Sequence, residues 1–194
     1  MEEYNIEKSY VGDFIGIRGT VKIENGEHIA IGRNHWVGQG FELIGGYLVT
    51  GAINVSGGWY GATDNWDIYI GSDTSTVTTV SMTSLISPIG TTPGTAPNTK
   101  SPSGAYYSSS TTPVVLSYVA TWNAGTVSGT LGEVGLYLLD AYYNVGVRPL
   151  TNSSYISNPA LVSRLSAADG SFTAFTINTA AALTVTWTVS FVYA

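Results

Sequence analysis

Apolar and polar residues alternate along much of the chain, most regularly over residues 183–193, LTVTWTVSFVY. Every second residue from Leu183 to Tyr193 is apolar, and Thr or Ser stands between them as far as Ser190. A period of two is that of a β-strand with one buried face, whereas a helix would scatter these apolar residues around its circumference. The segment therefore predicts a C-terminal strand inside a sheet.

Shorter stretches of strand-like composition recur upstream. They are FIGIRGTVKI (14–23), HIAI (28–31), DIYIG (67–71), VVLSYVATW (114–122), EVGLYLL (133–139), ALVSRLS (160–166) and SFTAFTI (171–177). Asn25-Gly26 between the first two predicts a hairpin, because both residues tolerate a positive φ. Ala168-Asp169-Gly170 predicts another hairpin between the last two.

Two segments depart from this β pattern. Apolar residues within 37–48 are spaced by four, three and four positions, which predicts one short helix. Residues 83–113 hold five of the seven prolines, which predicts a long loop. We expect contacts with neighbouring molecules to keep this loop ordered. We therefore expect an all-β fold, an antiparallel, jelly-roll-like β-sandwich over residues 34–194, preceded by an N-terminal arm and hairpin over residues 1–33.

Charged residues are few and unevenly placed. The chain has seven Lys and Arg against 13 Asp and Glu, a net charge of −6, and 11 of these 20 lie within residues 1–50. Charged residues make up 10% of the chain, whereas a typical soluble domain has about 25%. A hydroxyl-rich surface with little repulsion favours a subunit of an assembly, such as a homo-oligomer. A free Thr-rich β-protein is the alternative, and the lack of Lys and Arg clusters argues against nucleic-acid binding.

Other absences narrow the class of protein further. Cysteine is missing, the first ten residues, MEEYNIEKSY, do not resemble a signal peptide, and no apolar run is long enough to span a membrane. We expect synthesis in a reducing cytosol, or export by a route other than secretion, and no membrane partner. Sequence motifs of nucleophiles, phosphate-binding loops and zinc proteases are also missing, so the sequence predicts no enzyme, no catalytic residue and no cofactor.

Metal binding has little support in the sequence. The two histidines, His28 and His35, have no acidic residue at ligand spacing, and we expect them at a solvent edge or stacked on a ring. Asp64, Asn65 and Asp67 offer oxygen ligands of the type that calcium prefers. An Asx turn that leads into a strand explains these three residues more simply, without an ion, so no metal site is predicted.

Aromatic residues gather in the Gly-rich segment GGWYGATDNW (57–66). Their rings could stack on a sugar, but aromatic residues at strand ends more often cover a core or fill an interface. The candidate interaction surface therefore consists of Trp59, Tyr60, Trp66, Tyr106 and Tyr107.

Glu133 lies between glycines in an otherwise apolar strand. Without a nearby acid or histidine it is a poor catalyst, and burying it without a partner would be costly. Arg164 and Arg148 are the cations that could pair with it. We expect a structural ion pair between Glu133 and Arg164 across the sheet, with a solvent-exposed Glu133 as the alternative.

The order of several segments resembles a group of tailed-bacteriophage virion proteins. DIYIGSDTSTVTTVSMTSL is similar to their I-a-I-G-x-G-t…t-x-L stretch, and VVLSYVATW, GEVGLYLLD, LVSRLS and LTVTWTVSF follow in the same order. NHWVGQGFELIGGYL is similar to the helix that precedes them. The resemblance spans roughly residues 34–191, and a related arrangement occurs in the attachment domains of tail fibres.

This resemblance implies a structural protein that is synthesised in the host cytoplasm, is located in the virion and acts by assembly with other virion proteins. IGSD stands where the family has IGxG, which leaves the position in the particle open. A tail, baseplate or fibre-attachment protein is the first expectation. A capsid decoration protein and a β-sandwich that binds a glycan of the host surface are the alternatives.

Overall fold

The chain forms an all-β structure of antiparallel sheets. A computed structural model describes residues 15–40, 66–89, 99–100, 114–138 and 160–193. The first sheet has the order β2-β1-β11-β6. Its strands are β1 (Ile15–Asn25), β2 (His28–Arg33), β6 (Val114–Trp122) and β11 (Leu183–Tyr193). The second sheet has the order β3-β9-β8-β4-β5. Its strands are β3 (His35–Trp36), β4 (Trp66–Gly71), β5 (Thr99–Lys100), β8 (Glu133–Leu138) and β9 (Ala160–Ser166).

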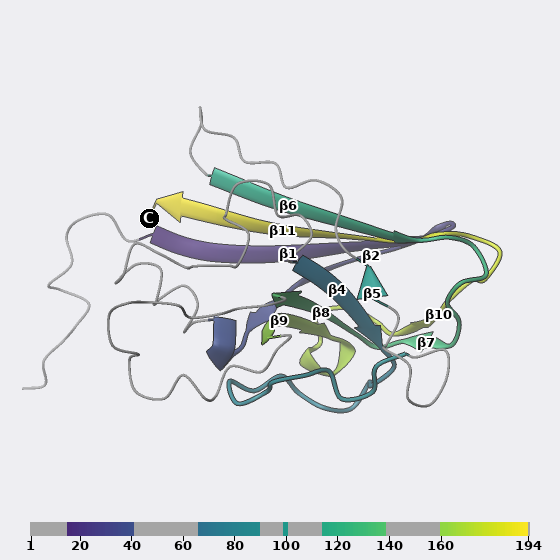
Figure 1. Cartoon of the computed structure of the whole chain (residues 1–194), viewed down its shortest axis with the longest axis horizontal. Helices are drawn as coiled ribbons and strands as arrows, with labels where there is room; N and C mark the ends of the chain where they lie inside the picture. Colours follow the sequence, from purple (N-terminus) through teal and green to yellow (C-terminus); the bar gives the residue numbers. More distant parts are fainter. Residues whose placement is uncertain (1–14, 41–65, 90–98, 101–113, 139–159, 194) are drawn as a thin grey trace, which may run out of the picture.

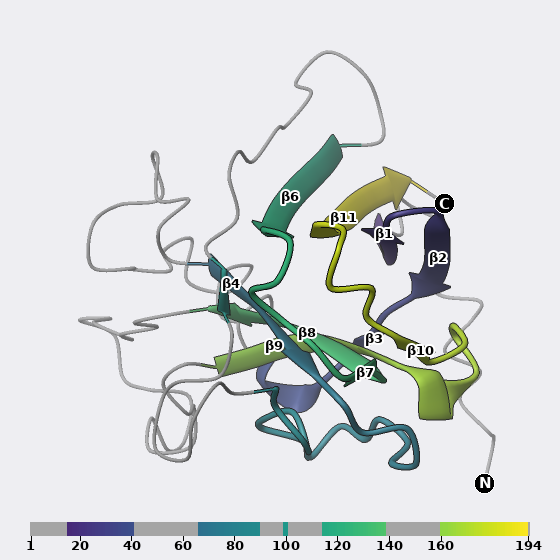
Figure 2. The same ribbon diagram turned by 90° about the vertical axis from the view of Figure 1, so that its right-hand side faces the viewer.

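The two sheets face each other, and a small ladder of β7 (Thr130–Leu131) and β10 (Phe175–Thr176) lies at one end of them (Figure 1). Figure 2 shows the same two layers end-on, with the first sheet above the second. The chain crosses between the layers several times, since β1 and β2 are followed by β3 and β4 in the other sheet and the last strand returns to the first. The predicted antiparallel sandwich is confirmed.

The strand predicted from the strict alternation at the C-terminus is the centre of the first sheet. Strand β11 pairs with β1 along its whole length, from Leu183 opposite Asn25 to Tyr193 opposite Ile15, and with β6 on its other side. The Asn25-Gly26 hairpin also forms, with Gly26 at a φ of 64°. The hairpin therefore belongs to the sheet of the sandwich.

Alternation along these strands builds the core. The first sheet turns Val21, Ile23, Val185 and the fully buried Trp187 toward the second sheet, while the intervening Thr residues of β11 face outward and are half-buried. The second sheet contributes apolar residues of β4, β8 and β9 to the same cluster, which are Ile68, Ile70, Val134, Leu136 and Leu165. Burial of the apolar faces between the sheets is the main stabilising term of such a sandwich.

The second sheet is covered on its other face as well. Residues 72–89, which follow β4, run along that face (Figure 1), and a smaller apolar cluster of Val37, Leu85, Tyr137 and Leu161 forms beneath them. A bulge between β8 and β9 at Leu136/Tyr137 places Tyr137 opposite Leu161, so both side chains join this cluster. Strand β9 is consequently buried at all seven positions.

One predicted element is wrong in its pairing. Residues 171–177 do not form a strand hairpinned to β9, because the chain leaves β9 through a short 3-10 helix, η3 (Ala167–Asp169), that ends at Gly170 with a φ of 71°. The Ser166 side chain caps this turn by accepting a hydrogen bond from the Ala168 N–H. Only Phe175–Thr176 is strand, and it pairs with β7.

Two other predicted segments are described only in part. Residues 38–40 are helical, and the rest of the helix predicted over 37–48 lies outside the described residues. Of the long loop predicted over 83–113, the structure describes residues 83–89 and 99–100. The arm over residues 1–14 also lies outside the described part of the chain.

Candidate functional site

The second sheet buries an ion pair on the face that residues 72–89 cover. Arg164 of β9 and Glu133 of β8 are both fully buried, and the Arg164 Nη2 lies 2.8 Å from the Glu133 Oε2. The Arg164 Nε donates a second hydrogen bond of 2.9 Å to the same oxygen. The pair predicted from sequence is therefore confirmed, and the alternative of an exposed Glu133 is wrong.

Residues of the covering segment accept hydrogen bonds from the other N–H groups of the Arg164 guanidinium. Nη1 donates to the Thr76 carbonyl oxygen at 2.8 Å and to the Thr78 hydroxyl at 3.1 Å, while Nη2 also donates to the Asp73 Oδ2 at 3.0 Å. Together with Glu133, these partners occupy all five N–H groups that an arginine offers. Arg164 thus joins the sheet to the first half of the segment.

Glu133 joins the sheet to the second half of the same segment. Its Oε1 accepts a hydrogen bond of 2.7 Å from the Ser87 N–H, and its Oε2 accepts one of 3.2 Å from the Ile86 N–H. Gly71 lies directly beside the carboxylate, and a side chain there would collide with Glu133 and with the Ser87 carbonyl. The carboxylate that stood out in the sequence therefore bonds two backbone amides in addition to its arginine.

Asp73 anchors the start of the segment through an Asx-type turn. Its carboxylate accepts hydrogen bonds from the Ser75 and Thr76 N–H groups and from the Ser75 hydroxyl. Burial acts to raise the pKa of Asp73, but the hydrogen bonds from Thr76 and Ser75 outweigh it and hold this pKa below its usual value. Asp73 is therefore ionised beside Arg164 at neutral pH.

Two further side chains hold the segment on the sheet. The Tyr137 hydroxyl accepts a hydrogen bond of 2.7 Å from the Leu85 N–H, and burial raises the pKa of this phenol far above its usual value. The carboxylate of Asp169 in η3 accepts hydrogen bonds from both the N–H and the hydroxyl of Thr78. The His35 Nε2 lies 4.0 Å from the same carboxylate, at the edge of the cluster.

We call this set of polar side chains, Arg164, Glu133, Asp73, Tyr137 and Asp169, the brace cluster. Its oxygen and nitrogen atoms bind one another or the backbone of residues 72–89, so they have little capacity left for a substrate. Sequence reasoning identified the central pair but not the other three members. The run Asp73-Thr-Ser-Thr directly after a strand is typical of an Asx turn, and it is the signal that could have identified Asp73.

The braced segment exposes apolar side chains. Val77 is 58% exposed, Val80 is 68% exposed and Ile86 is 48% exposed. Their backbone is fixed by the brace cluster and by hydrogen bonds from the Gly38 N–H to the Val80 carbonyl and from the Ser72 N–H to the Ser87 carbonyl. We call Val77, Val80 and Ile86 the loop patch.

Of the candidate interaction surface predicted from aromatic residues, only Trp66 is described. Trp66 is half-buried and packs on the main core, with its ring 5.2 Å from that of Tyr118. This position fits the expectation that such rings cover a core better than it fits a sugar platform. The remaining members lie outside the described residues, namely Trp59, Tyr60, Tyr106 and Tyr107.

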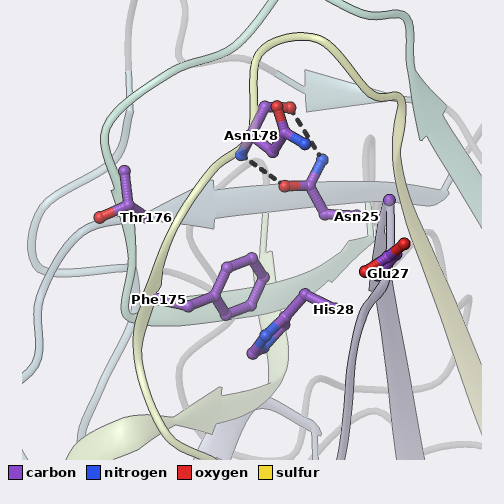
Figure 3. A pocket seen from close by; sticks show the side chains of 7 residues that line it. Asn25, Glu27, His28, Phe175, Thr176 and Asn178 are labelled. Carbon is purple, nitrogen blue, oxygen red and sulfur yellow. Dashed lines mark hydrogen bonds between the residues drawn. The ribbon is translucent and has the colours of Figure 1, made fainter.

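A hollow of about 420 Å³ opens beside the tip of the β1–β2 hairpin (Figure 3). The ring of His28 stacks on that of Phe175 with centroids 3.8 Å apart, as expected of a stacked histidine. Asn25 closes the inner side, because its amide and carbonyl groups bond the backbone of residues 178, 181 and 182. Asn25 is therefore structural, while His28 and Glu27 remain exposed.

A second hollow, of about 640 Å³, lies at the other end of β2. Arg33, Asn34 and His35 line one side of it, and Gly170 and Ser171 line the other. His35 is half-exposed here, in the solvent-edge position expected of it. The two hollows thus flank the same strand.

The chain shows no significant similarity to a protein-family model, a curated protein or a solved structure. Within the described ranges, no three side chains of His, Cys, Asp or Glu are grouped as metal ligands. Asp67 is buried on β4, and the Asp64 and Asn65 predicted beside it lie outside these ranges. No described helix has the length and apolar character needed to cross a membrane.

Proposed function

We propose that this chain is a structural subunit of a tailed-phage virion, a tail, baseplate or fibre-attachment protein that acts by assembly with other virion proteins and not by catalysis. The resemblance of its segment order to such proteins supports the class. The use of its buried acid and base groups supports a structural role. Arg164 and Glu133 bind a backbone segment, and this arrangement leaves neither group positioned to transfer a proton.

The observation that carries the proposal is the loop patch on a braced segment. An apolar side chain on an ordered backbone loses little entropy when a partner covers it, and clustered apolar anchors supply most of the affinity of many interfaces. Five side chains of the brace cluster hold a segment whose outward residues are Val77 and Val80. A segment held so firmly, with apolar residues outside, has the properties of a docking surface.

Locating the protein in a phage particle tests whether it belongs to the proposed class of virion proteins. A gold-binding tag can be inserted at Gly125, which lies in an exposed turn with open space around it. We expect electron microscopy of phage particles from a culture that produces the tagged chain to place gold at the tail or baseplate. Gold spread over the head would favour the capsid decoration alternative, and particles without gold would overturn the proposal.

The loop patch is tested in the same particles. The double variant V77D/V80D should fold like the wild type, since both side chains are mostly exposed, but it should be incorporated at least tenfold less. The double variant A124D/S128D is the matched control, because it adds the same two negative charges at exposed positions elsewhere. Equal incorporation of the two variants would contradict a docking role for the patch.

A further inference from the structure

Strand β2 is an edge strand without the usual protection. It pairs with β1 on one side, from Arg33 opposite Thr20 to His28 opposite Asn25, and no described strand pairs with its other side (Figure 2). Natural sheets protect such edges with Lys, Pro or bulges. The sequence HIAIGR has neither Lys nor Pro, and its ladder with β1 is regular. The outer edge of β2 can therefore accept another strand.

The backbone of β2 directs hydrogen-bonding groups to this edge. Positions 25 and 28 flank the turn between β1 and β2, and such a turn is closed by a hydrogen bond between its flanking residues. Bonded and non-bonded positions alternate along an antiparallel ladder, so the even positions of β2 bond β1. The Asn34 N–H continues this series with its bond to the Gly19 carbonyl. The backbone groups of Ile29, Ile31 and Arg33 therefore point to the open edge.

The side chains of this edge follow a simple order. Ile29 is 57% exposed and Ile31 is 65% exposed on the outward face, while Ala30 between them packs against the core. Glu27 in the turn and Arg33 at the end of the strand are also exposed. Neither Glu27 nor Arg33 has an ion-pair partner among the described residues. The edge thus carries two apolar side chains between one acid and one base.

This order of side chains is complementary to itself in the antiparallel direction. When Ala30 lies opposite Ala30 of a second copy, Ile29 of each copy lies opposite Ile31 of the other. The same register brings Arg33 of each copy opposite Glu27 of the other. Apolar side chains then meet at the centre of the contact and opposite charges meet at both of its ends. Moving the register by two residues in either direction separates Arg33 from Glu27.

We propose that two copies of this chain join through β2 in a two-fold symmetric dimer, with Ala30 on the axis. The first sheets of both copies merge into one sheet of the order β6-β11-β1-β2-β2-β1-β11-β6. The pair of Ile29 and Ile31 occurs twice and exchanges both of its backbone hydrogen bonds each time. His28 comes opposite Gly32, which has no side chain to collide with it. The contact is closed, because both copies use the same surface.

The charges select a second copy as the occupant of this edge. Glu27 and Arg33 stand at equal distances in sequence on either side of Ala30, which is the spacing that a two-fold axis through Ala30 requires. Strand addition takes its affinity from backbone hydrogen bonds and its specificity from side chains, and here the axis repeats every side-chain contact. The inference rests on the proposed role in assembly, since it names a contact that joins copies of the chain.

Disulfide trapping tests the contact and its register, because the chain has no cysteine. Protein carrying Ile29→Cys is mixed with protein carrying Ile31→Cys under mild oxidation. We expect the mixture to form several-fold more crosslinked dimer than either variant alone, since only unlike positions lie opposite each other. Ser128→Cys, exposed in the loop after β6, gives the background. A mixture no better than this background would overturn the inference, and Ile31→Cys that crosslinks best with itself would overturn the register.

Charge reversal tests the ion pairs of the dimer. Arg33→Glu places like charges at both ends of the contact and should raise the dissociation constant, measured by analytical ultracentrifugation, at least tenfold. The double variant E27R/R33E restores opposite charges and should return the dissociation constant to within about threefold of the wild type. This recovery also shows that the Arg33→Glu change permits folding. An unchanged dissociation constant in Arg33→Glu would overturn the charge pairing, and a wild type that stays monomeric would overturn the dimer.

The same variants separate this inference from the proposed function. Particles that incorporate the chain in a manner sensitive to V77D/V80D, although the mixture gives no crosslink between positions 29 and 31, would leave the assembly role intact and remove only the β2 contact. A crosslinked dimer that never enters particles would remove the proposed function and leave the dimer.

Discussion

At the scale of single residues, Arg164 determines how residues 72–89 are held on the second sheet. A buried arginine is tolerated only when its charge is compensated and its donors are bonded. Here two carboxylates compensate the charge, and the fork of the guanidinium reaches from the sheet to three residues of the covering segment. Lysine could supply the charge but not the five directed donors. The fold is therefore sensitive to this one side chain.

Replacing Arg164 with methionine should cost about 3–5 kcal/mol of unfolding free energy, because Glu133 and Asp73 would be left as uncompensated buried charges. Arg164→Lys should be intermediate. Lys22→Met removes a cation from the exposed pair with Glu24 and should cost no more than about 1 kcal/mol. Urea denaturation of the three variants measures these values. Similar costs for Arg164→Met and Lys22→Met would show that the brace cluster is not a stabilising unit.

Asp73 gives the molecule an acid-sensitive contact. Its pKa is lower in the folded protein than in the unfolded chain, so its contribution is complete above about pH 4, near the unfolded value. The contribution is lost as the pH falls further, toward the folded pKa. We expect thermal unfolding between pH 5 and about pH 3 to show a steeper loss of stability in the wild type than in Asp73→Asn. Parallel pH profiles would contradict this assignment.

At the scale of elements, alternation predicted the strands well. The strands around Ile15, His28, Trp66, Val114 and Glu133 form as expected, as do β9 and β11. Alternation could not predict that β9 is buried on both faces, because its second cover is an irregular segment whose contacts are long-range. The predicted strand over residues 171–177 failed for a local reason. The Ser166 cap and Gly170 end β9 in a 3-10 turn and direct the chain to β7.

The candidate site could be predicted only at its centre. Opposite charges on neighbouring apolar strands indicated Glu133 and Arg164, because each had few other partners to choose from. Asp73 accepts a hydrogen bond from Arg164, and Asp169 accepts one from Thr78. Each bond joins residues 91 positions apart in the sequence, and no local pattern predicts such a contact. Tyr137 looked like an ordinary strand aromatic. It lies on the same face of β8 as Glu133, but its bond to the Leu85 N–H joins residues 52 positions apart, which no local pattern predicts.

Tyr137 should control how firmly the covering segment is held. Tyr137→Phe removes the acceptor of the Leu85 N–H, and a buried amide left without a partner costs about 1–3 kcal/mol. Hydrogen exchange at Leu85 should therefore become roughly 5- to 150-fold faster. Tyr118→Phe, in the first sheet, is the control and should leave Leu85 unchanged. Equal exchange in both variants would show that Tyr137 does not hold the segment.

At the scale of the whole molecule, the two sheets present different surfaces. The first sheet shows an outward face rich in threonine, while the second sheet lies under the braced segment with its apolar loop patch. The contact proposed for the loop patch is therefore apolar. Salt distinguishes it from a contact made by charges, since ions screen exposed charges and strengthen apolar burial only weakly.

Salt should leave the loop-patch contact unchanged or strengthen it. Screening acts over about 10 Å at 0.1 M ionic strength and about 3 Å at 1 M, so a contact made by exposed charges weakens between these conditions. Incorporation through the loop patch depends on the uncharged side chains of Val77 and Val80 and should stay constant or rise. Counting tagged chains per particle after assembly at the two salt concentrations measures this. Incorporation that falls several-fold at 1 M would mean that charged side chains, and not the loop patch, hold the subunit in the particle.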